Sequence, residues 1–276
     1  MKEISYLEIK TSVKKAIFDS CFNLNEYSLN KLKEARDSEN KELAKTIITQ
    51  LLDNADIANR DEIPMCQDTG IVTCMVYLGR DVHLDCSLES PINDAVKEAY
   101  EEYYLRKSVV DPISRINTKN NTPAIIHTSI VEGDKLTIYV VPKGAGSENM
   151  SQIKMLNPTV GEQGIIDFVK NVVLEAGGKA CPPIYLGVGI GGNFETCAML
   201  AKEALATRSD PKNETISNLK NKLLNEINSL DIGPMGLGGN TTCLGVFIKT
   251  CPCHIASLPV AVNIQCHANR HVEIKL

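Results

Sequence analysis

The order in which helical and strand-like apolar patterns follow one another limits the possible folds of this sequence more than any other feature. Apolar residues recur at helical spacing in residues 4–22 and 43–58, and the polar stretch 23–42 between them predicts a loop. Short runs rich in β-branched residues begin only at residue 71. Without regular strand–helix–strand alternation, this order predicts an α+β (mixed α/β) fold: a helical N-terminal region followed by a mainly antiparallel or mixed sheet with packed helices.

The elements beyond residue 70 follow from local signals. Residues 71–79 predict a buried strand, and Ser90, followed by a proline, predicts the N-cap of a helix that ends near Arg106. Residues 124–131 and 135–142 predict an antiparallel hairpin. The remaining predicted elements are a helix ending at Gly177 or Gly178, a strand and turn over 181–195, helices over 193–206 and 214–230, and strands over 243–249, 254–266 and 271–276. No long linker divides the chain, so we expect one domain over residues 1–276.

Composition narrows the class of protein. Apolar residues make up 43% of the 276 residues, enough for a substantial core. The sequence contains no apolar run of bilayer length, and its first ten residues lack the apolar stretch of a signal peptide, so we expect a cytoplasmic protein without a membrane partner. A formal net charge of −5 argues against nucleic acid as a partner, because phosphate binding needs a basic surface.

Ten cysteines are many for a chain expected in a reducing compartment, where disulfides rarely persist. Cys21, Cys74 and Cys197 lie inside periodic patterns, so we expect them to be buried as small apolar side chains. Burial is also favoured for Cys86 and Cys243. The other five lie in loops, where a thiolate is able to reach a metal. These are Cys66, Cys181, Cys251, Cys253 and Cys266.

Two arrangements of these loop cysteines compete. One is a structural zinc site in a non-catalytic binding module, made by "CPCHIA" and "CHANRH" with Cys251, Cys253, His254, Cys266 and His267 as ligands, although the C-x-C spacing is a poor match to known zinc motifs. The other gathers Cys66, Cys181 and Cys266 around one iron–sulfur cluster with one iron left open as a Lewis acid. Spacing alone supports neither strongly.

Five motifs in order carry a family resemblance. "PMCQDTG", "GAGSEN", "CPPIYLGVGIGGNFE", "GPMGLGGNTTCLGV" and "CHANRH" resemble the α subunit, or N-terminal half, of the iron–sulfur class I fumarate hydratases and the related L-tartrate dehydratases. The resemblance runs from about residue 10 to the C-terminus. It implies a 4Fe–4S cluster held by Cys66, Cys181 and Cys266.

The resemblance also implies roles for other residues. Asp68 and His254 become a proton-handling couple, although Asp68 alone would suit an Asx-turn and a lone histidine is more often a core residue. Arg106, by default a solvated helix-end cation, becomes a clamp for a substrate carboxylate. The implied substrate-binding residues are Gln67, Arg106, Gly146 and Arg270, with His271 in a similar place.

The run "GVGIGG" fits the dinucleotide pattern G-x-G-x-x-G at Gly187, Gly189 and Gly192. The helix that follows leads to another helix, where a nucleotide-binding unit needs a second parallel strand, so nucleotide binding is not expected. We expect these glycines, with Gly144 and Gly146, to let backbone approach the cluster or the substrate.

The resemblance finally implies a partner and a reaction. Fused members of the family continue into a second domain that completes the active site, whereas this chain stops at Leu276, so we expect a separate β subunit in an α2β2 assembly. The expected reaction is the reversible hydration of fumarate, a small dicarboxylate, to L-malate. The alternative reaction is the dehydration of L(+)-tartrate.

Overall fold

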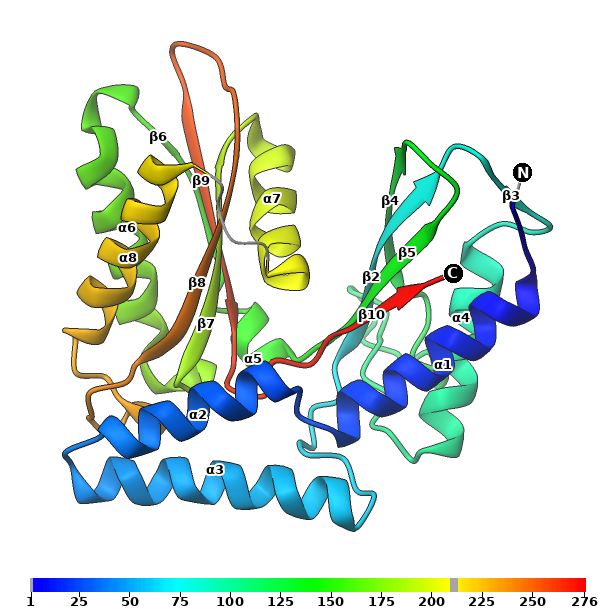
Figure 1. Cartoon of the computed structure of the whole chain (residues 1–276), viewed down its shortest axis with the longest axis horizontal. Helices are drawn as coiled ribbons and strands as arrows, with labels where there is room; N and C mark the ends of the chain where they lie inside the picture. The colour runs from blue at the N-terminus through cyan, green and yellow to red at the C-terminus, as the bar shows by residue number, and fades with distance from the viewer. Residues whose placement is uncertain (1, 209–212) are drawn as a thin grey trace. The chain divides into compact units, whose positions relative to one another are not determined.

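The computed structural model describes residues 2–208 and 213–276, which form two compact units (Figure 1). Unit 1 comprises Met1–Asn25, Asn54–Ala145 and Arg270–Leu276, and unit 2 comprises Glu26–Asp53 and Gly146–Asn269. The chain passes between the units four times, at residues 25/26, 53/54, 145/146 and 269/270. Each unit is therefore discontinuous in sequence, and folding of residues 1–276 as one domain stays a prediction.

Unit 1 is built on a four-stranded sheet in the order β10–β5–β2–β4 (Figure 1). The strands are β2 (Ile71–Gly79), β4 (Ile125–Val131), β5 (Leu136–Lys143) and β10 (Val272–Lys275). The predicted hairpin of residues 124–131 with 135–142 is wrong, because β2 lies between the two and pairs parallel with β4 and antiparallel with β5. The run of buried residues in β2 suits this central position, where both edges are paired.

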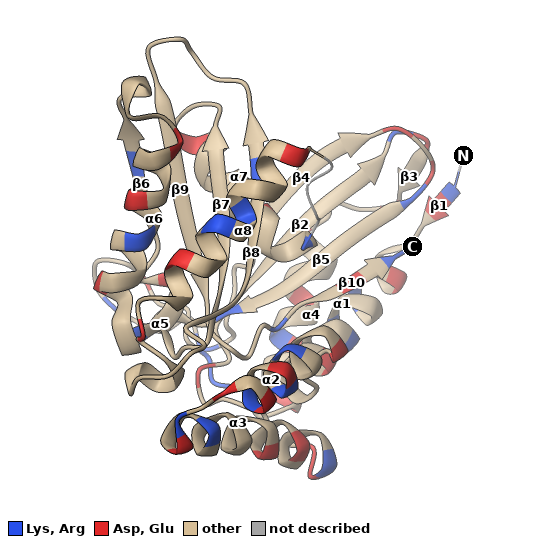
Figure 2. Cartoon of the chain, turned by 60° about the vertical axis from the view of Figure 1, so that its left-hand side comes forward, with Lys and Arg blue, Asp and Glu red and all other residues tan. Residues whose placement is uncertain are grey.

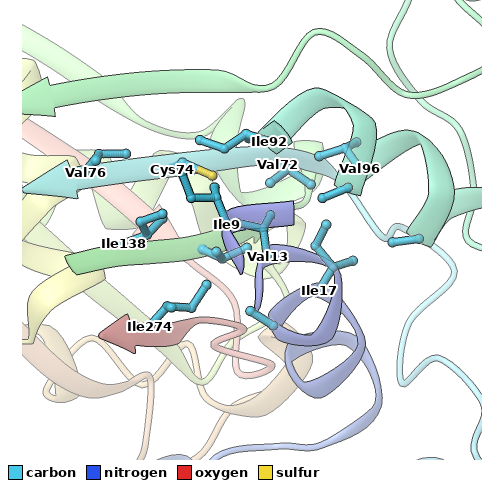
Figure 3. Close-up of a cluster of buried hydrophobic side chains, with 14 of the residues drawn as sticks. Ile9, Val13, Ile17, Val72, Cys74, Val76, Ile92, Val96, Ile138 and Ile274 are labelled. Carbon is cyan, nitrogen blue, oxygen red and sulfur yellow. The ribbon is translucent and has the colours of Figure 1, made fainter. Parts of the chain in front are cut away.

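The core of unit 1 lies between this sheet and two helices, α1 (Tyr6–Phe22) and α4 (Glu89–Glu102). Side chains two apart on β2 point to the same face, and there they meet residues spaced by about one turn on α1. Figure 3 shows this cluster, which includes Ile9, Val13, Ile17, Val72, Cys74 and Val76. A short parallel pair, β1 (Lys2–Ile4) and β3 (Val82–Leu84), completes the unit's strands.

The ends of α1 and α4 are fixed in different ways. Ser5 and Glu8 form a reciprocal capping box at the start of α1. The predicted N-cap at Ser90 is wrong, because α4 begins at Glu89 and its preceding residue makes no side-chain cap. The helix also ends at Glu102 rather than near Arg106, since the chain turns at Tyr104, whose φ is +54°.

Unit 2 is built on a second four-stranded sheet, in the order β6–β9–β7–β8. Its strands are β6 (Gln152–Leu156), β7 (Ile184–Gly191), β8 (Cys243–Cys251) and β9 (Leu258–Gln265). The sheet is mixed, because β7 pairs parallel with β8 and antiparallel with β9. Helices α6 (Gly161–Ala176) and α8 (Glu214–Asn228) share an apolar core with one face, and α7 (Phe194–Thr207) covers the other. The short helices are α5 (Ala145–Glu148), η1 (Pro158–Val160), η2 (Gly177–Ala180) and η3 (Pro234–Gly236).

Two helices lie between residues 25 and 61, where one was predicted. Helix α3 (Glu42–Arg60) matches the expected second helix. Residues 23–42 were predicted to be a loop, but most of them form α2 (Glu26–Ser38). Only Ser28, Leu32 and Ala35 of α2 are buried, a narrow stripe at helical spacing that a mostly polar composition conceals.

The helices and mixed sheets confirm the predicted α+β class. Figure 2 shows lysine, arginine, aspartate and glutamate concentrated on helices and turns, whereas the strands carry few charges. Among the described residues, no helix combines the length and the apolar character that a bilayer span requires.

Candidate active site

The turn over residues 66–70 in unit 1 carries three of the predicted site residues, and buried side chains hold it. The Tyr100 hydroxyl donates to the carbonyl oxygens of Thr69, at 2.9 Å, and Gly70, at 3.1 Å. The Asn121 side-chain amide also donates to the Gly70 carbonyl, at 3.1 Å. Tyr100 and Asn121 are both fully buried. The turn is therefore fixed from behind by partners that cannot exchange freely with water.

Asp68 lies in this turn with both carboxylate oxygens bonded to backbone. Oδ1 accepts from the Gly70 N–H at 3.1 Å, which is the Asx-turn foreseen from sequence. Oδ2 accepts from the Ala145 N–H at 2.8 Å. An Asx-turn alone needs only the first bond, so the second, to a residue 77 positions away, fixes the carboxylate against another loop.

Gly144 lets Asp68 and Arg270 approach the same point. A Cβ at position 144 would lie 3.0 Å from Asp68 Oδ2 and 3.2 Å from Arg270 Nη2, both tighter than ordinary van der Waals contacts. Glycine at position 144 therefore allows these two side chains to approach, whereas its predicted approach to a cluster or substrate stays a prediction. Arg270 itself is only 3% exposed. A buried guanidinium and an oriented carboxylate thus flank one glycine in unit 1.

Cys21 and Cys66 complete the surroundings of this pair. The Cys21 thiol is buried, and its carbonyl accepts from the Met65 N–H at 3.0 Å, so α1 anchors the start of the turn. Burial raises the pKa of the Cys21 thiol, although the neighbouring Arg270 guanidinium partly opposes this shift. Cys66 is half-buried, and its sulfur lies 3.7 Å from Oε1 of the exposed Gln67.

Arg106 lies outside α4, in the loop that follows it, with an exposed side chain. Its carbonyl accepts from the Thr69 hydroxyl at 3.0 Å, which ties the loop to the residue after Asp68. Among the described residues its guanidinium has no ion-pair partner. The backbone of Arg106 is therefore bonded to the turn, and its exposed guanidinium is not at the end of a helix, where the sequence alone had placed it.

The structure brings the Cys181 and Cys266 loops together in unit 2. Cys181 is exposed and follows η2, and its backbone adopts the left-handed conformation, with φ at +54°. His267, which follows Cys266, holds its Nδ1 3.0 Å from the Cys181 carbonyl oxygen. The neighbouring strands β7 and β9 pair Tyr185 with Gln265, which keeps the two loops at one end of the sheet. Cys66 belongs to unit 1, so convergence of all three thiols stays a prediction.

His254 lies at the other end of this sheet. It precedes β9, whereas Cys266 follows it, and eight residues of antiparallel strand separate the two by roughly 23 Å. The predicted zinc ligands Cys251 and Cys253 lie near His254, since Cys251 pairs with Gly191 at the far end of β7. The zinc arrangement is therefore wrong, because its five ligands divide between opposite ends of the sheet. Among residues 2–208 and 213–276, no three His, Cys, Asp or Glu side chains are grouped to hold a metal ion.

The glycines of "GVGIGG" serve packing rather than a ligand, which corrects the sequence-based expectation. A Cβ on Gly187 would lie 2.0 Å from the Ala201 carbonyl oxygen, and one on Gly189 would lie 2.1 Å from that of Cys197. Both glycines allow α7 to pack directly on β7. Gly146 differs, since it is exposed and a Cβ there would meet only the Lys179 carbonyl oxygen at an ordinary 3.6 Å.

Burial of the cysteines matches the prediction except at Cys86, which is half-buried although burial was expected. Cys21, Cys74, Cys197 and Cys243 are buried, whereas Cys66 and Cys266 are half-buried and Cys181 is exposed. Burial raises the pKa of Cys74, Cys197 and Cys243 to about 12, because an apolar environment disfavours the thiolate. A thiolate ligand is thus disfavoured at these three buried positions.

Sequence reasoning missed Tyr100 and Asn121, which hold the turn from behind. Tyr100 reads as one more apolar residue of α4. Asn121 lies in the polar run "NTKNNTP", and its positive φ of +61° is of a kind that asparagine tolerates well. No sequence signal separates Asn121 from the other asparagines of this run.

Comparison with known proteins places these features in a family. Residues 10–275 match the family model described as fumarate hydratase (Fumerase). A protein of Methanocaldococcus jannaschii, provisionally named L(+)-tartrate dehydratase subunit alpha, is 40% identical over 273 residues that cover 96% of each chain. The L(+)-tartrate dehydratase subunit alpha of Escherichia coli strain K12 is 33% identical over 248 residues, 88% of this chain and 82% of its own.

Proposed function

We infer that this chain, which belongs to the fumarate hydratase (Fumerase) family, is the α subunit of a hydro-lyase that acts with a separate β subunit on a small 2-hydroxydicarboxylate. The observation that carries this inference is the pair formed by the oriented Asp68 carboxylate and the buried Arg270 guanidinium on either side of Gly144. The names of the relatives, each a subunit alpha, support the partnership.

The residues of unit 1 suit the elimination of water from such a substrate. Two backbone N–H groups fix the Asp68 carboxylate, so it is oriented to hold or deliver a proton without reorganising. Arg270 and the exposed Arg106 are cations suited to bidentate contact with substrate carboxylates. Gln67 of unit 1 and Gly146 of unit 2 are both exposed, and their predicted contact with substrate stays part of the proposal.

The donor set also fits a 4Fe–4S cluster. Cys66, Cys181 and Cys266 lie in loops, the first and last half-buried and Cys181 exposed, whereas four of the other cysteines are buried. We propose that these three thiolates hold the cluster; the contact between His267 and the Cys181 carbonyl, which joins the loops of Cys181 and Cys266, supports this for two of them. When bound, the cluster would supply an open iron as a Lewis acid for the substrate hydroxyl.

His254 enters this proposal only through a second copy of the chain. Because roughly 23 Å of β9 separates it from Cys266, it cannot serve the site of its own unit 2. In the expected α2β2 assembly, His254 of one α subunit would serve the site of the other.

The substrate is tested with the reconstituted αβ enzyme, assayed anaerobically with L-malate and with L(+)-tartrate. The family description supports fumarate and malate, whereas the relatives' names give tartrate at least equal support. Both substrates carry two carboxylates and a hydroxyl on the adjacent carbon, so the same residues serve either. We expect turnover of one or both by αβ and negligible turnover by purified α. Full activity of α alone would refute the division of the active site between two subunits, and inactive αβ would refute the hydro-lyase activity.

We place the enzyme in the cytoplasm.

A further inference from the structure

The loop over residues 104–121 in unit 1 exposes large apolar side chains. Tyr104 is 93% exposed, Ile113 89% and Ile116 69%. Single exposed apolar residues are common on protein surfaces, but three within thirteen residues of one loop are a concentration typical of an interaction site.

This loop is held in one shape by its own hydrogen bonds. The Asp111 carboxylate accepts from the backbone N–H groups of Ile113, at 3.1 Å, and Ser114, at 2.7 Å, and from the Ser114 hydroxyl at 2.8 Å. The Asp111 N–H donates to the Ile116 carbonyl at 2.9 Å and closes the tip. The two isoleucines are thus presented on a closed turn, which lowers the entropic cost of binding a partner.

The base of the loop is tied to the candidate active site. Asn121 is fully buried, and its Oδ1 accepts from the N–H groups of Ser108, at 2.6 Å, and Val109, at 3.2 Å. Its Nδ2 donates to the Gly70 carbonyl, two residues after Asp68. A partner that contacts the loop would therefore lie against the element that positions Asp68 and Arg106.

The charge of the loop indicates which kind of partner fits. Residues 104–121 contain four basic residues and one acidic residue, Asp111, although the whole chain carries a net charge of −5. In a symmetric contact between two copies of this chain, the basic loop of one copy would face the same basic loop of the other, and their like charges would repel. A different chain with acidic groups around an apolar patch matches it better.

We propose that the 104–121 loop is a docking surface for the β subunit, with Ile113 and Ile116 as apolar anchors and Arg115 and Lys119 as a basic rim. This proposal rests on the proposed function, since it assumes that a β subunit exists. It adds the surface by which that subunit reaches the Asp68 turn.

The test measures binding of purified, cluster-loaded α to the β subunit of the same organism by calorimetry. The double variant I113D/I116D should weaken the Kd at least about tenfold, because charges replace buried anchors. Thermal unfolding and the iron and sulfide content of α should not change, since both side chains point to solvent. The matched control is I130D, an isoleucine 76% exposed on β4 of the same unit, and it should bind β as wild type does.

A second variant keeps the proposal testable if I113D/I116D folds poorly. R115Q/K119Q removes two rim charges, and should slow association at low salt with little change in the dissociation rate. If wild-type α does not bind the β subunit at all, both the docking surface and the proposed partnership with a β subunit are refuted. If wild type binds and the well-folded I113D/I116D variant keeps the wild-type Kd, the docking surface alone is refuted. The same holds if that variant changes only the self-association of α.

Discussion

Replacing Gly144 by alanine tests the geometry of the site most simply. The added Cβ would lie 3.0 Å from Asp68 Oδ2, 3.2 Å from Arg270 Nη2 and 3.3 Å from Asp68 Cγ. Contacts this tight require the neighbours to move by a few tenths of an ångström. Asp68 cannot move freely, because Gly70 and Ala145 hold its two oxygens.

The size of the effect follows from that displacement. A misplacement of 1 Å can lower turnover about 100-fold, so a shift of a few tenths should lower it about four- to tenfold. Overpacking should also cost about 1–3 kcal/mol in the free energy of unfolding. The assay is kcat and KM of the reconstituted αβ enzyme, with iron content and urea unfolding measured on the same preparation.

A matched glycine serves as control. Gly245 is also buried and has no positive φ, but a Cβ there would meet its neighbours no closer than 3.4 Å, an ordinary contact. We expect G245A to keep turnover within about twofold of wild type, since ordinary contacts need no rearrangement. If G144A, fully loaded with iron, turned over as fast as G245A, the claim that Asp68 and Arg270 act from this point would be refuted.

Four further expectations follow from particular contacts. N121A should destabilise the chain by about 3 kcal/mol in urea unfolding, because two backbone N–H groups lose their partner and the Gly70 carbonyl keeps only its bond from Tyr100; an unchanged midpoint would count against this role. I17A should cost about 2–5 kcal/mol, since Ile17 is fully buried in the unit 1 core. The Cys74 thiol stays protonated up to about pH 12 in the folded chain, whereas in the unfolded chain it ionises near pH 8.5. Its contribution to the free energy of unfolding is therefore complete below about pH 8.5 and is lost as the pH rises from there to about 12. The C74A variant should accordingly lose less stability than wild type over this pH range. Co-purified mixtures of H254A and C266S α subunits should regain part of the activity that each lacks, if His254 acts across two copies.

Local patterns were enough to predict most elements, but not their neighbours in space. The strands at residues 124–131 and 135–142 were located correctly, yet their pairing failed because β2, more than forty residues earlier, inserts between them. Loop length favours a hairpin, whereas the central place goes to the strand that can be buried on both faces. Helix α2 was missed because its buried stripe comprises only three residues.

The candidate site shows the same limit. The motif around Cys66 and Asp68 indicated the turn, and the Asx-turn bond to Gly70 followed from local chemistry. The second bond, from Ala145, depends on tertiary packing that no local spacing encodes. The glycines of β7 look like a ligand-binding motif in sequence, but α7 packs against them. His254 lies twelve residues from Cys266 (266 − 254), and because most of that stretch is an extended strand, the two are far apart.

Anaerobic purification with analysis of iron and acid-labile sulfide tests the central claim most directly. The wild-type chain should be brown and contain about four irons and four sulfides. C66S, C181S and C266S should each lose most of the iron, whereas C253S, at an exposed cysteine far from Cys266, should retain it. A colourless wild-type protein, or full iron loading in all three serine variants, would contradict the account.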